Sequence, residues 1–164
     1  MQQDTSAKKA KIKYTHGNQA ILEEIKALWE GLNEHNLLLS PYFKQHYQTF
    51  TFEVRKADLQ KKASETQMRI DLATDKATTQ HVGYIVSSIN KEKTGEIDSI
   101  FVNPSYRGFG VGDALMKRAL VWMDKKGVMA KIVEISVGNE QAFGFYSRYG
   151  FYPRKTLLKQ VKEC

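Results

Sequence analysis

The chain has 164 residues, 41% hydrophobic and 26% charged, with 11 Gly and 3 Pro, which fits one globular domain and excludes a disordered, collagen-like or low-complexity protein. The formal net charge of +7 comes entirely from the two ends, because residues 17–147 carry sixteen charges of each sign. Since a duplex-binding protein typically gathers its basic residues along one helix or groove, this distribution argues against nucleic-acid binding as the main function.

The first part of the chain predicts one short strand followed by two helices. Apolar residues alternate with lysines from Ile12, a strand pattern that ends at about residue 16. Asn18 is a typical helix cap, and the apolar residues after it recur on one face of a helix that runs to about residue 36. Ser40 and Pro41 predict the cap and first turn of a second helix, which runs to about residue 64.

The middle of the chain predicts three successive strands. From residue 67 the apolar period changes to two, which is typical of half-buried strands. The alternation predicts strands at about 68–72 and 82–86. After a turn near residues 90–95, a third strand is expected at 96–102, where Asn103 and Pro104 stop it.

The last third predicts alternating helices and strands. A Gly-rich turn leads into an amphipathic helix that Gly127 stops, and a β-branched run follows it. Because a helical crossover joins the strand at 96–102 to that run, the two strands should be parallel. We therefore expect one α/β domain over residues 1–164. The expected elements are a helix at 111–126, a strand at 132–137, a helix at 139–149, and final strands at 151–152 and 157–158.

The most informative segment is Arg107-Gly108-Phe109-Gly110-Val111-Gly112, which lies between a predicted strand and a predicted helix. Glycines allow the backbone to turn tightly against a ligand, and the unpaired N–H groups of a helix start favour an anion such as a pyrophosphate. A P-loop is excluded because Asp113 follows Gly112 where that motif requires Lys. The glycine spacing and the late position also fit a dinucleotide-binding turn poorly.

Two motifs resemble the GNAT superfamily of N-acetyltransferases. Arg107-x-x-Gly110-x-Gly112 resembles its acetyl-CoA signature, and the run from Asn139 through Phe145-Tyr146 to Gly150-Phe151 resembles its second motif. The match covers about residues 96–152, while the first ninety residues agree in element order only. The resemblance implies a mixed, mostly antiparallel central sheet with helices on both faces and a parallel strand pair splayed around the cofactor.

The resemblance also implies how acetyl-CoA, the expected co-substrate, is held. Backbone groups at Ile100, Phe101 and Val102 would pair with the pantetheine arm, and Asn139 would bond that arm or merely cap its helix. Arg148, Arg154 or Lys155 would approach the 3′-phosphate. The backbone amides that would hold the pyrophosphate, with added charge from the Arg107 side chain, are those of Arg107, Gly108, Phe109, Gly110, Val111 and Gly112.

Two side chains are the expected catalysts. Tyr146 matches the tyrosine that in many relatives protonates the departing CoA thiolate and also contacts the cofactor, although it equally fits an aromatic core. Glu96 stands where some relatives keep a glutamate base that acts directly or through water. Asp98 lies on the same face of the strand, so the base is Glu96, Asp98 or water, with Glu96 preferred.

The resemblance implies direct transfer of an acetyl group from acetyl-CoA to a primary amine in a ternary complex. The alternative is a non-catalytic acyl-CoA-binding module on the same fold. The acceptor is left open among small amines, aminoglycosides, polyamines and protein amines, and relatives build its pocket from the helical region at about residues 18–64. An aromatic cluster there is either the acceptor wall or packing on the sheet: Tyr42, Phe43, His46, Tyr47, Phe50 and Phe52.

The sequence predicts no metal, no membrane span and a cytoplasmic location. The one cysteine, Cys164, cannot form a disulfide within the chain, and the four histidines lack metal-ligand spacing. The first thirteen residues contain no apolar run of the kind found in signal peptides, and no window approaches the roughly 20 apolar residues of a membrane span. A homodimer is left open, because relatives often dimerise.

Overall fold

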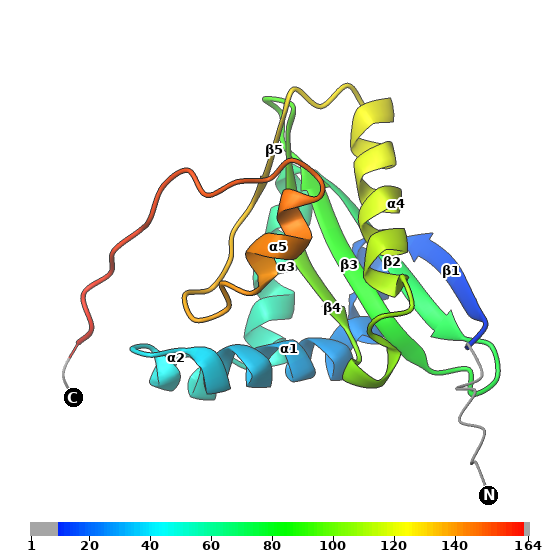
Figure 1. The fold of residues 1–164 in the computed structure, drawn as a ribbon. Coiled ribbons are helices and arrows are strands. Elements are labelled where there is room, and N and C mark those ends of the chain that lie inside the picture. Colours follow the sequence, from blue (N-terminus) through cyan, green and yellow to red (C-terminus); the bar gives the residue numbers. More distant parts are fainter. Residues whose placement is uncertain (1–9, 163–164) are drawn as a thin grey trace, which may run out of the picture.

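The computed structural model describes residues 10–162, which form a five-stranded sheet flanked by helices (Figure 1). The strands lie side by side in chain order, β1-β2-β3-β4-β5. Each neighbouring pair is antiparallel except β4 and β5, which are parallel. The predicted mixed, mostly antiparallel sheet is therefore confirmed. Its strands are β1 (Ile12–Gly17), β2 (Gln67–Asp75), β3 (His81–Ile89), β4 (Thr94–Val102) and β5 (Ala130–Val133).

Helices cover both faces of this sheet. One core cluster combines side chains of the first helices with β2 and β3, and a second combines α4 with the other face of β3. Because both of its faces are covered, β3 is buried almost continuously from residue 82 to residue 89. The helices are η1 (Gln19–Ile25), α1 (Lys26–Leu39), α2 (Lys44–Thr49), α3 (Phe52–Glu65), η2 (Pro104–Tyr106), α4 (Val111–Lys125) and α5 (Ala142–Ser147).

A buried carboxylate fastens α4 to the sheet. Asp71 of β2 is fully buried and accepts hydrogen bonds from the guanidinium groups of Arg118 on α4, at 2.7 Å, and Arg69, at 2.8 Å. A buried charge is tolerated only when it is paired and hydrogen-bonded, and here two cations meet that requirement. The bond to Arg118 fixes where α4 lies on the sheet.

The helix predicted at residues 40–64 is wrong in one respect, because it is two helices. α2 ends at Thr49 and α3 begins at Phe52, with Thr51 capping α3 by accepting the Val54 N–H. The break is stabilised by Asn33 of α1, whose side-chain amide donates to the carbonyls of residues 47 and 50. Ser40, predicted to cap the second helix, instead follows the last residue of α1, and its hydroxyl accepts the Phe43 N–H in the turn before α2.

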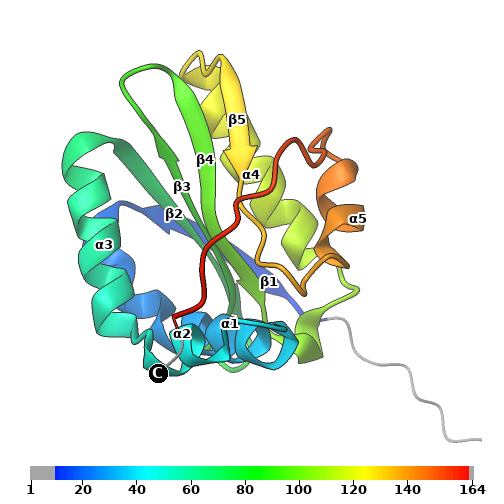
Figure 2. The same ribbon diagram turned by 90° about the vertical axis from the view of Figure 1, so that its left-hand side faces the viewer.

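The last predicted strands differ from the structure as well. β5 is shorter and earlier than the predicted 132–137, and neither 151–152 nor 157–158 is a strand. Residues 151–162, called the C-terminal arm below, contain no helix or strand and lead away from the sheet (Figures 1 and 2). A strand requires a neighbouring strand to satisfy its N–H and C=O groups, and the described chain gives the arm none.

β4 contains a β-bulge at the point where its pairing with β5 ends. Val86 of β3 faces Ser99 and the next residue, Ser87, faces Ile97, so Asp98 is the extra residue of β4. β5 pairs only with Thr94–Ile97. From the bulge to Val102, no strand within residues 10–162 pairs with β4 on the β5 side, so the parallel pair ends where the resemblance predicted a splay.

Candidate active site

The open edge of β4 carries the backbone positions predicted to pair with pantetheine. Ile100 and Val102 pack toward the α4 cluster, whereas Phe101 points to the other face and packs against Gly31 of α1. The side chain of Arg107 donates from Nε to the Val102 carbonyl at 2.9 Å and lies 5.2 Å from the centre of the Phe101 ring. The Val102 carbonyl at the end of this edge therefore accepts a hydrogen bond from a side chain and not from a neighbouring strand.

The glycine turn begins immediately after this edge. Gly108 and Gly110 have φ near +80°, a backbone conformation that residues with side chains rarely adopt, and Gly110 caps the start of α4. A Cβ on Gly112 would come within 3.4 Å of the Phe145 ring, so α4 and α5 approach closely here. Val111 is buried in the core and anchors the turn, while Phe109 is about half exposed. The amides at the start of α4 are thereby held beside the edge of β4.

Tyr146 lies on α5 within the α4 core cluster and is 8% exposed. Its ring packs edge-on against Phe145 and Phe151. Burial raises the pKa of Tyr146 to about 12, from an ordinary value of about 10, so the phenol is protonated at neutral pH, as an unperturbed tyrosine also is. Packing and chemistry are both compatible with this position.

Asp113, in the first turn of α4, connects α4 to the residues that follow α5. It accepts a hydrogen bond from the Tyr149 hydroxyl and forms an ion pair with Arg148 at 3.2 Å. The bond from Tyr149, together with the charge of Arg148, lowers the pKa of Asp113. Because Arg148 is committed to this contact, Arg154 and Lys155, exposed on the C-terminal arm, are the less constrained of the three cations predicted near a 3′-phosphate.

Glu96 and Asp98 share a cation that sequence reasoning missed. Lys62 of α3 binds the Glu96 carboxylate at 2.5 Å and also the Asp98 carboxylate. Asp98 is the more buried of the two acids, with a side chain only 3% exposed, and its Oδ2 finds no hydrogen-bond partner within the described chain. Burial raises the pKa of Asp98 even though Lys62 opposes the shift.

Arg55, also on α3, donates to the backbone carbonyl of Asp98 at 2.9 Å, at the bulge. Arg55 and Lys62 are seven residues apart, two helical turns, and so lie on one face of α3. That spacing was available in the sequence. Nothing there indicated that this face meets the central strand.

The two expected catalysts lie against opposite faces of the sheet. Tyr146 belongs to the cluster on the α4 face, whereas Glu96 belongs to the ion cluster on the α3 face. Between them, the pairing of β4 with β5 ends at Ile97.

Asn139 does not cap the last helix. α5 begins at Ala142 without a side-chain cap, and Asn139 precedes it in the loop after β5. Its side-chain oxygen lies 3.3 Å from Nε2 of His35 on α1. In the same loop, Ser136 accepts a hydrogen bond from the Tyr47 hydroxyl of α2 at 2.9 Å. The loop is thus fastened to α1 and α2.

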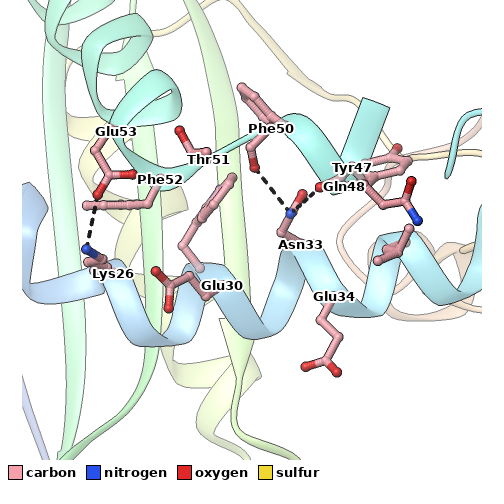
Figure 3. Close-up of a pocket in the computed structure, with 12 residues that line it drawn as sticks. Lys26, Glu30, Asn33, Glu34, Tyr47, Gln48, Phe50, Thr51, Phe52 and Glu53 are labelled. Carbon is pink, nitrogen blue, oxygen red and sulfur yellow. Dashed lines mark hydrogen bonds and ion pairs between the residues drawn. The ribbon is translucent and has the colours of Figure 1, made fainter. Parts of the chain in front are cut away.

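The aromatic cluster of residues 42–52 is divided. Tyr47, Phe50 and Phe52 line a groove of about 520 Å³ between α1 and the α2–α3 segment (Figure 3), whereas Tyr42 is 72% exposed and is not among its lining residues. Phe52 is buried against Trp29, and Phe50 packs edge-on against the same indole at 5.5 Å. The acidic residues that line the groove are Glu30, Glu34 and Glu53.

Two further observations concern the whole described chain. Residues 10–162 bring no group of three His, Cys, Asp or Glu side chains together in a way that could hold a metal ion. Within the same residues, no helix has both the length and the hydropathy that crossing a bilayer requires.

Comparison with known proteins identifies the family. A model of the acetyltransferase (GNAT) family matches residues 32–151, which is most of the chain, so the protein belongs to this family. An uncharacterized N-acetyltransferase of Methanocaldococcus jannaschii is 40% identical over 82 residues, 47% of this chain and 35% of that protein. The match thus spans about a third of that relative's length.

Solved structures share the fold at low sequence identity. An acetyltransferase from Pyrococcus furiosus superposes with a TM-score of 0.67 at 20% identity, covering 92% of this chain and all of the other. The aminoglycoside N-acetyltransferase AAC(6')-Iy, in complex with a CoA bisubstrate analogue, gives a TM-score of 0.63 at 20% identity, covering 94% of this chain and all of that one. The predicted GNAT fold is confirmed.

Proposed function

We propose that this protein is an acetyl-CoA-dependent N-acetyltransferase that moves the acetyl group directly to a primary amine in a ternary complex. The observation that carries the proposal is the convergence of the open edge of β4, the glycine turn at the start of α4, and the buried, protonated Tyr146. Membership of the acetyltransferase family supports it. We also propose a cytoplasmic location, on the sequence alone.

The residues present fit acetyl-CoA. The cradle at Gly108 and Gly110 has open space where a Cβ would stand, and the amides at the start of α4 favour the pyrophosphate. The backbone from Ile100 to Val102 would pair with the pantetheine arm. Arg107, now hydrogen-bonded to the Val102 carbonyl, would release it and turn its charge toward the phosphates. Asn139 would contact the arm from the opposite side.

The chemistry needs three things from the protein. The attacking amine must be neutral, so that its nitrogen can form a bond to the acetyl carbon while the carbon–sulfur bond breaks. The carbonyl oxygen gains charge during attack, and a free backbone N–H of β4 near Val102 would stabilise it. Tyr146 would give its proton to the departing thiolate, and the proton that the amine loses would pass to a carboxylate.

We assign that carboxylate to Glu96, acting directly or through water. Glu96 is partly exposed on the face that an acceptor would approach, whereas Asp98 is nearly buried. Both are held by Lys62, whose ammonium resembles that of a primary amine substrate. The pair of carboxylates therefore suits an ammonium group before it loses its proton.

The acceptor remains a primary amine without further definition. The wall of its pocket would come from η1 to α3 and from the loop after β5, which Tyr47 and His35 fasten to those helices. The aminoglycoside acetyltransferase that shares the fold is 20% identical, so its acceptor class is one candidate to include in a screen.

The direct test is thiol release from acetyl-CoA in the presence of a broad amine panel: aminoglycosides, polyamines, small amines and peptides with free N-termini or lysines. We expect one class to raise release well above the rate without amine, and acetylated amine to appear in equal amount. Acetyl-CoA binding by calorimetry without any turnover across the panel would instead support a non-catalytic acyl-CoA-binding module.

A further inference from the structure

The carboxylates of Glu96 and Asp98 hold one cation between them. The Lys62 ammonium, from the last turn of α3, donates to Glu96 Oε2 at 2.5 Å and also to Asp98 Oδ1. These bonds use two of the three N–H groups that a lysine carries. The space between the two carboxylates, called the ammonium site below, therefore suits a primary ammonium, which can divide its donors between both acids.

Lys62 satisfies the ammonium site only in part. The Asp98 side chain is 3% exposed, and its Oδ2 finds no hydrogen-bond partner among the described residues. Buried polar atoms are nearly always paired, so this oxygen calls for a donor. Burial also raises the pKa of Asp98, although Lys62 and the nearby Ser88 hydroxyl both favour the charged form. One lysine thus does not offset the full cost of burying this carboxylate.

A second cation cannot simply join the first. Arg55 of α3 donates to the Asp98 backbone carbonyl at 2.9 Å, so Arg55 and Lys62 together already balance the two carboxylates. Like charges a few ångströms apart repel strongly where water is largely excluded. An acceptor that arrives as an ammonium is therefore bound at this site only when one of the two cations leaves.

Lys62 is the cation that can leave. Its side chain is 32% exposed on a flexible stem, whereas Arg55 is bonded to the backbone of the bulge. Because Lys62 lies in the last turn of α3, its released ammonium would stay beside the free carbonyls of the helix end, where cations are favoured. Asp98 lies two residues before Ile100, so the vacated site adjoins the backbone proposed to pair with pantetheine.

We propose that Lys62 occupies, in the free protein, the site that binds the ammonium group of the acceptor, and that the acceptor displaces it. The acceptor class is then a primary alkylammonium, either a free amine or the side chain of another lysine. Asp98 holds the incoming ammonium and Glu96 takes its proton. Lys62 acts as an internal competitor that lowers the apparent affinity for amines. This inference rests on the proposed function, because it takes Glu96 as the base.

Amine binding without acetyl-CoA gives the first test. Butylammonium is titrated by calorimetry into the unmodified chain, Lys62→Met and Lys56→Met. Lys56 is the matched control, because it lies on the same helix, has a 33% exposed side chain and pairs with Glu23 at 2.8 Å. We expect Lys62→Met alone to bind at least about tenfold more tightly, since an internal competitor leaves the site free for only a fraction of the time. Equal affinities in all three proteins, or weaker binding by Lys62→Met, overturn the proposal.

Further titrations define what is bound and where. Butyltrimethylammonium carries the same charge without an N–H to donate, so it should gain nothing from Lys62→Met, and an equal gain would overturn the proposed site. In Lys62→Met/Asp98→Asn the gain for butylammonium should disappear, and its persistence would exclude Asp98. Nα-acetyl-lysine N-methylamide presents a lysine side chain alone. A gain for both primary amines admits a protein lysine as acceptor, and a gain for butylammonium alone indicates small amines.

Lysine NMR gives a second test that needs no variant. In the unmodified chain with isotope-labelled lysine, the ε-methylene signal of Lys62 should move toward the position of exposed lysines as butylammonium is added, while the signal of Lys56 stays in place. A Lys62 signal that does not move at amine concentrations that saturate calorimetric binding overturns the displacement.

Kinetics separate this proposal from the acetyl-transfer assignment. With acetyl-CoA present, KM for butylamine should fall about tenfold in Lys62→Met while kcat changes less than about twofold. If Lys62→Met binds the amine more tightly but no form of the protein releases thiol, the ammonium site stands and the acetyltransferase assignment fails. If acetyl transfer proceeds with the same KM in Lys62→Met as in the unmodified chain, the assignment stands and the displacement is wrong.

Discussion

At the scale of single residues, Tyr146 shows how one side chain serves both packing and chemistry. Its ring is part of the aromatic core, and its hydroxyl, whose pKa burial raises to about 12, is protonated at neutral pH and so carries a proton that a departing thiolate could take. An aromatic residue in such a cluster is ordinarily explained by packing alone. The position of Tyr146 within the second motif is the observation that favours a catalytic role.

Removing the Tyr146 hydroxyl separates the two roles. Tyr146→Phe keeps the ring, so we expect kcat for acetyl transfer to fall about 10²-fold or more, as for the loss of a general acid, with little change in acetyl-CoA affinity by calorimetry. Tyr152→Phe is the control, because Tyr152 is exposed, and it should leave kcat unchanged. An unaffected kcat in Tyr146→Phe removes this residue from its proposed role.

The base can be tested through pH. Glu96→Gln should lower the rate about 10²-fold near neutral pH, and the deficit should shrink as pH rises, because the acceptor amine then loses its proton to solvent. The measurement is a pH–rate profile beside Glu92→Gln, an exposed acid in the β3–β4 turn. A profile for Glu96→Gln that parallels the unmodified protein at every pH would make the assignment wrong and direct attention to Asp98.

At the scale of elements, the glycine turn joins backbone strain to ligand binding. Gly110 has φ of +81°, and a Cβ added there would meet no neighbouring atom. A substitution to Ala would therefore be disfavoured by the backbone conformation and not by a steric clash. The same holds for Gly127, beyond the C-terminal end of α4. The two glycines make a matched pair, one beside the proposed pyrophosphate site and one remote from it.

Both Gly110→Ala and Gly127→Ala should lower the free energy of unfolding by about 1–2 kcal/mol, the cost of a left-handed backbone for a residue with a side chain. Gly110→Ala alone should also weaken acetyl-CoA binding, by about tenfold, because the amides of the turn shift. Urea unfolding and calorimetric titration measure the two effects. Equal acetyl-CoA affinities for the two variants would contradict the proposed place of the cofactor.

Lys62 links α3 to β4 through ion pairs, and its contribution to stability depends on pH. Burial lowers the pKa of Lys62, but the hydrogen bonds that its ammonium donates to the Asp98 and Glu96 carboxylates, with the attraction of their charges, outweigh burial and raise the pKa above its ordinary value of 10.5. A cation whose folded-state pKa is raised stabilises the fold fully below its unfolded pKa and loses that contribution as pH rises through the folded value. The contribution should therefore be constant near neutral pH and disappear above pH 10.5.

Lys62→Met should accordingly lower the free energy of unfolding by about 1–3 kcal/mol near neutral pH, the usual cost of removing a hydrogen bond to a charged group. The difference from the unmodified protein should shrink above pH 10.5. Urea unfolding at a series of pH values provides the measurement. A difference that stays the same at high pH would mean that the Lys62 charge is not what stabilises the fold here.

At the scale of the whole molecule, two core clusters share one sheet. Leu59 of α3 belongs to the cluster on one face and Leu115 of α4 to the cluster on the other, and both are almost fully buried. Because β3 contributes side chains to both clusters, neither face can unfold without exposing the other. We expect a single cooperative transition, as proposed for one domain over the chain.

Leu59→Ala and Leu115→Ala should each lower the free energy of unfolding by about 2–5 kcal/mol, the cost of a core cavity. Both should move one common transition in urea to lower concentration without changing its slope. Two resolved transitions, each affected by one variant only, would show instead that the two faces are separate folding units.

The sequence by itself determined the order of the elements as far as the last helix, apart from the division between α2 and α3, together with the parallel pair and the glycine turn. These follow from local periodicity, from helix and turn residues such as Asn18, Gly110 and Gly127, and from the handedness of the crossover. The family motifs, which lie in one continuous region, were recognisable for the same reason. Each of these features depends on residues that are near neighbours in the chain.

Only the tertiary structure decided the features that join distant segments. The break between α2 and α3 depends on Asn33, the ion cluster joins Lys62 to Glu96 and Asp98, and the bond between His35 and Asn139 spans 104 residues. The sequence also predicted final strands at residues 151–152 and 157–158, but neither forms, because a strand exists only beside another strand. The local sequence pattern determines which secondary structure a segment favours. Whether that structure forms depends on hydrogen-bond and ion-pair partners that lie far away in the chain, and only the tertiary structure places them.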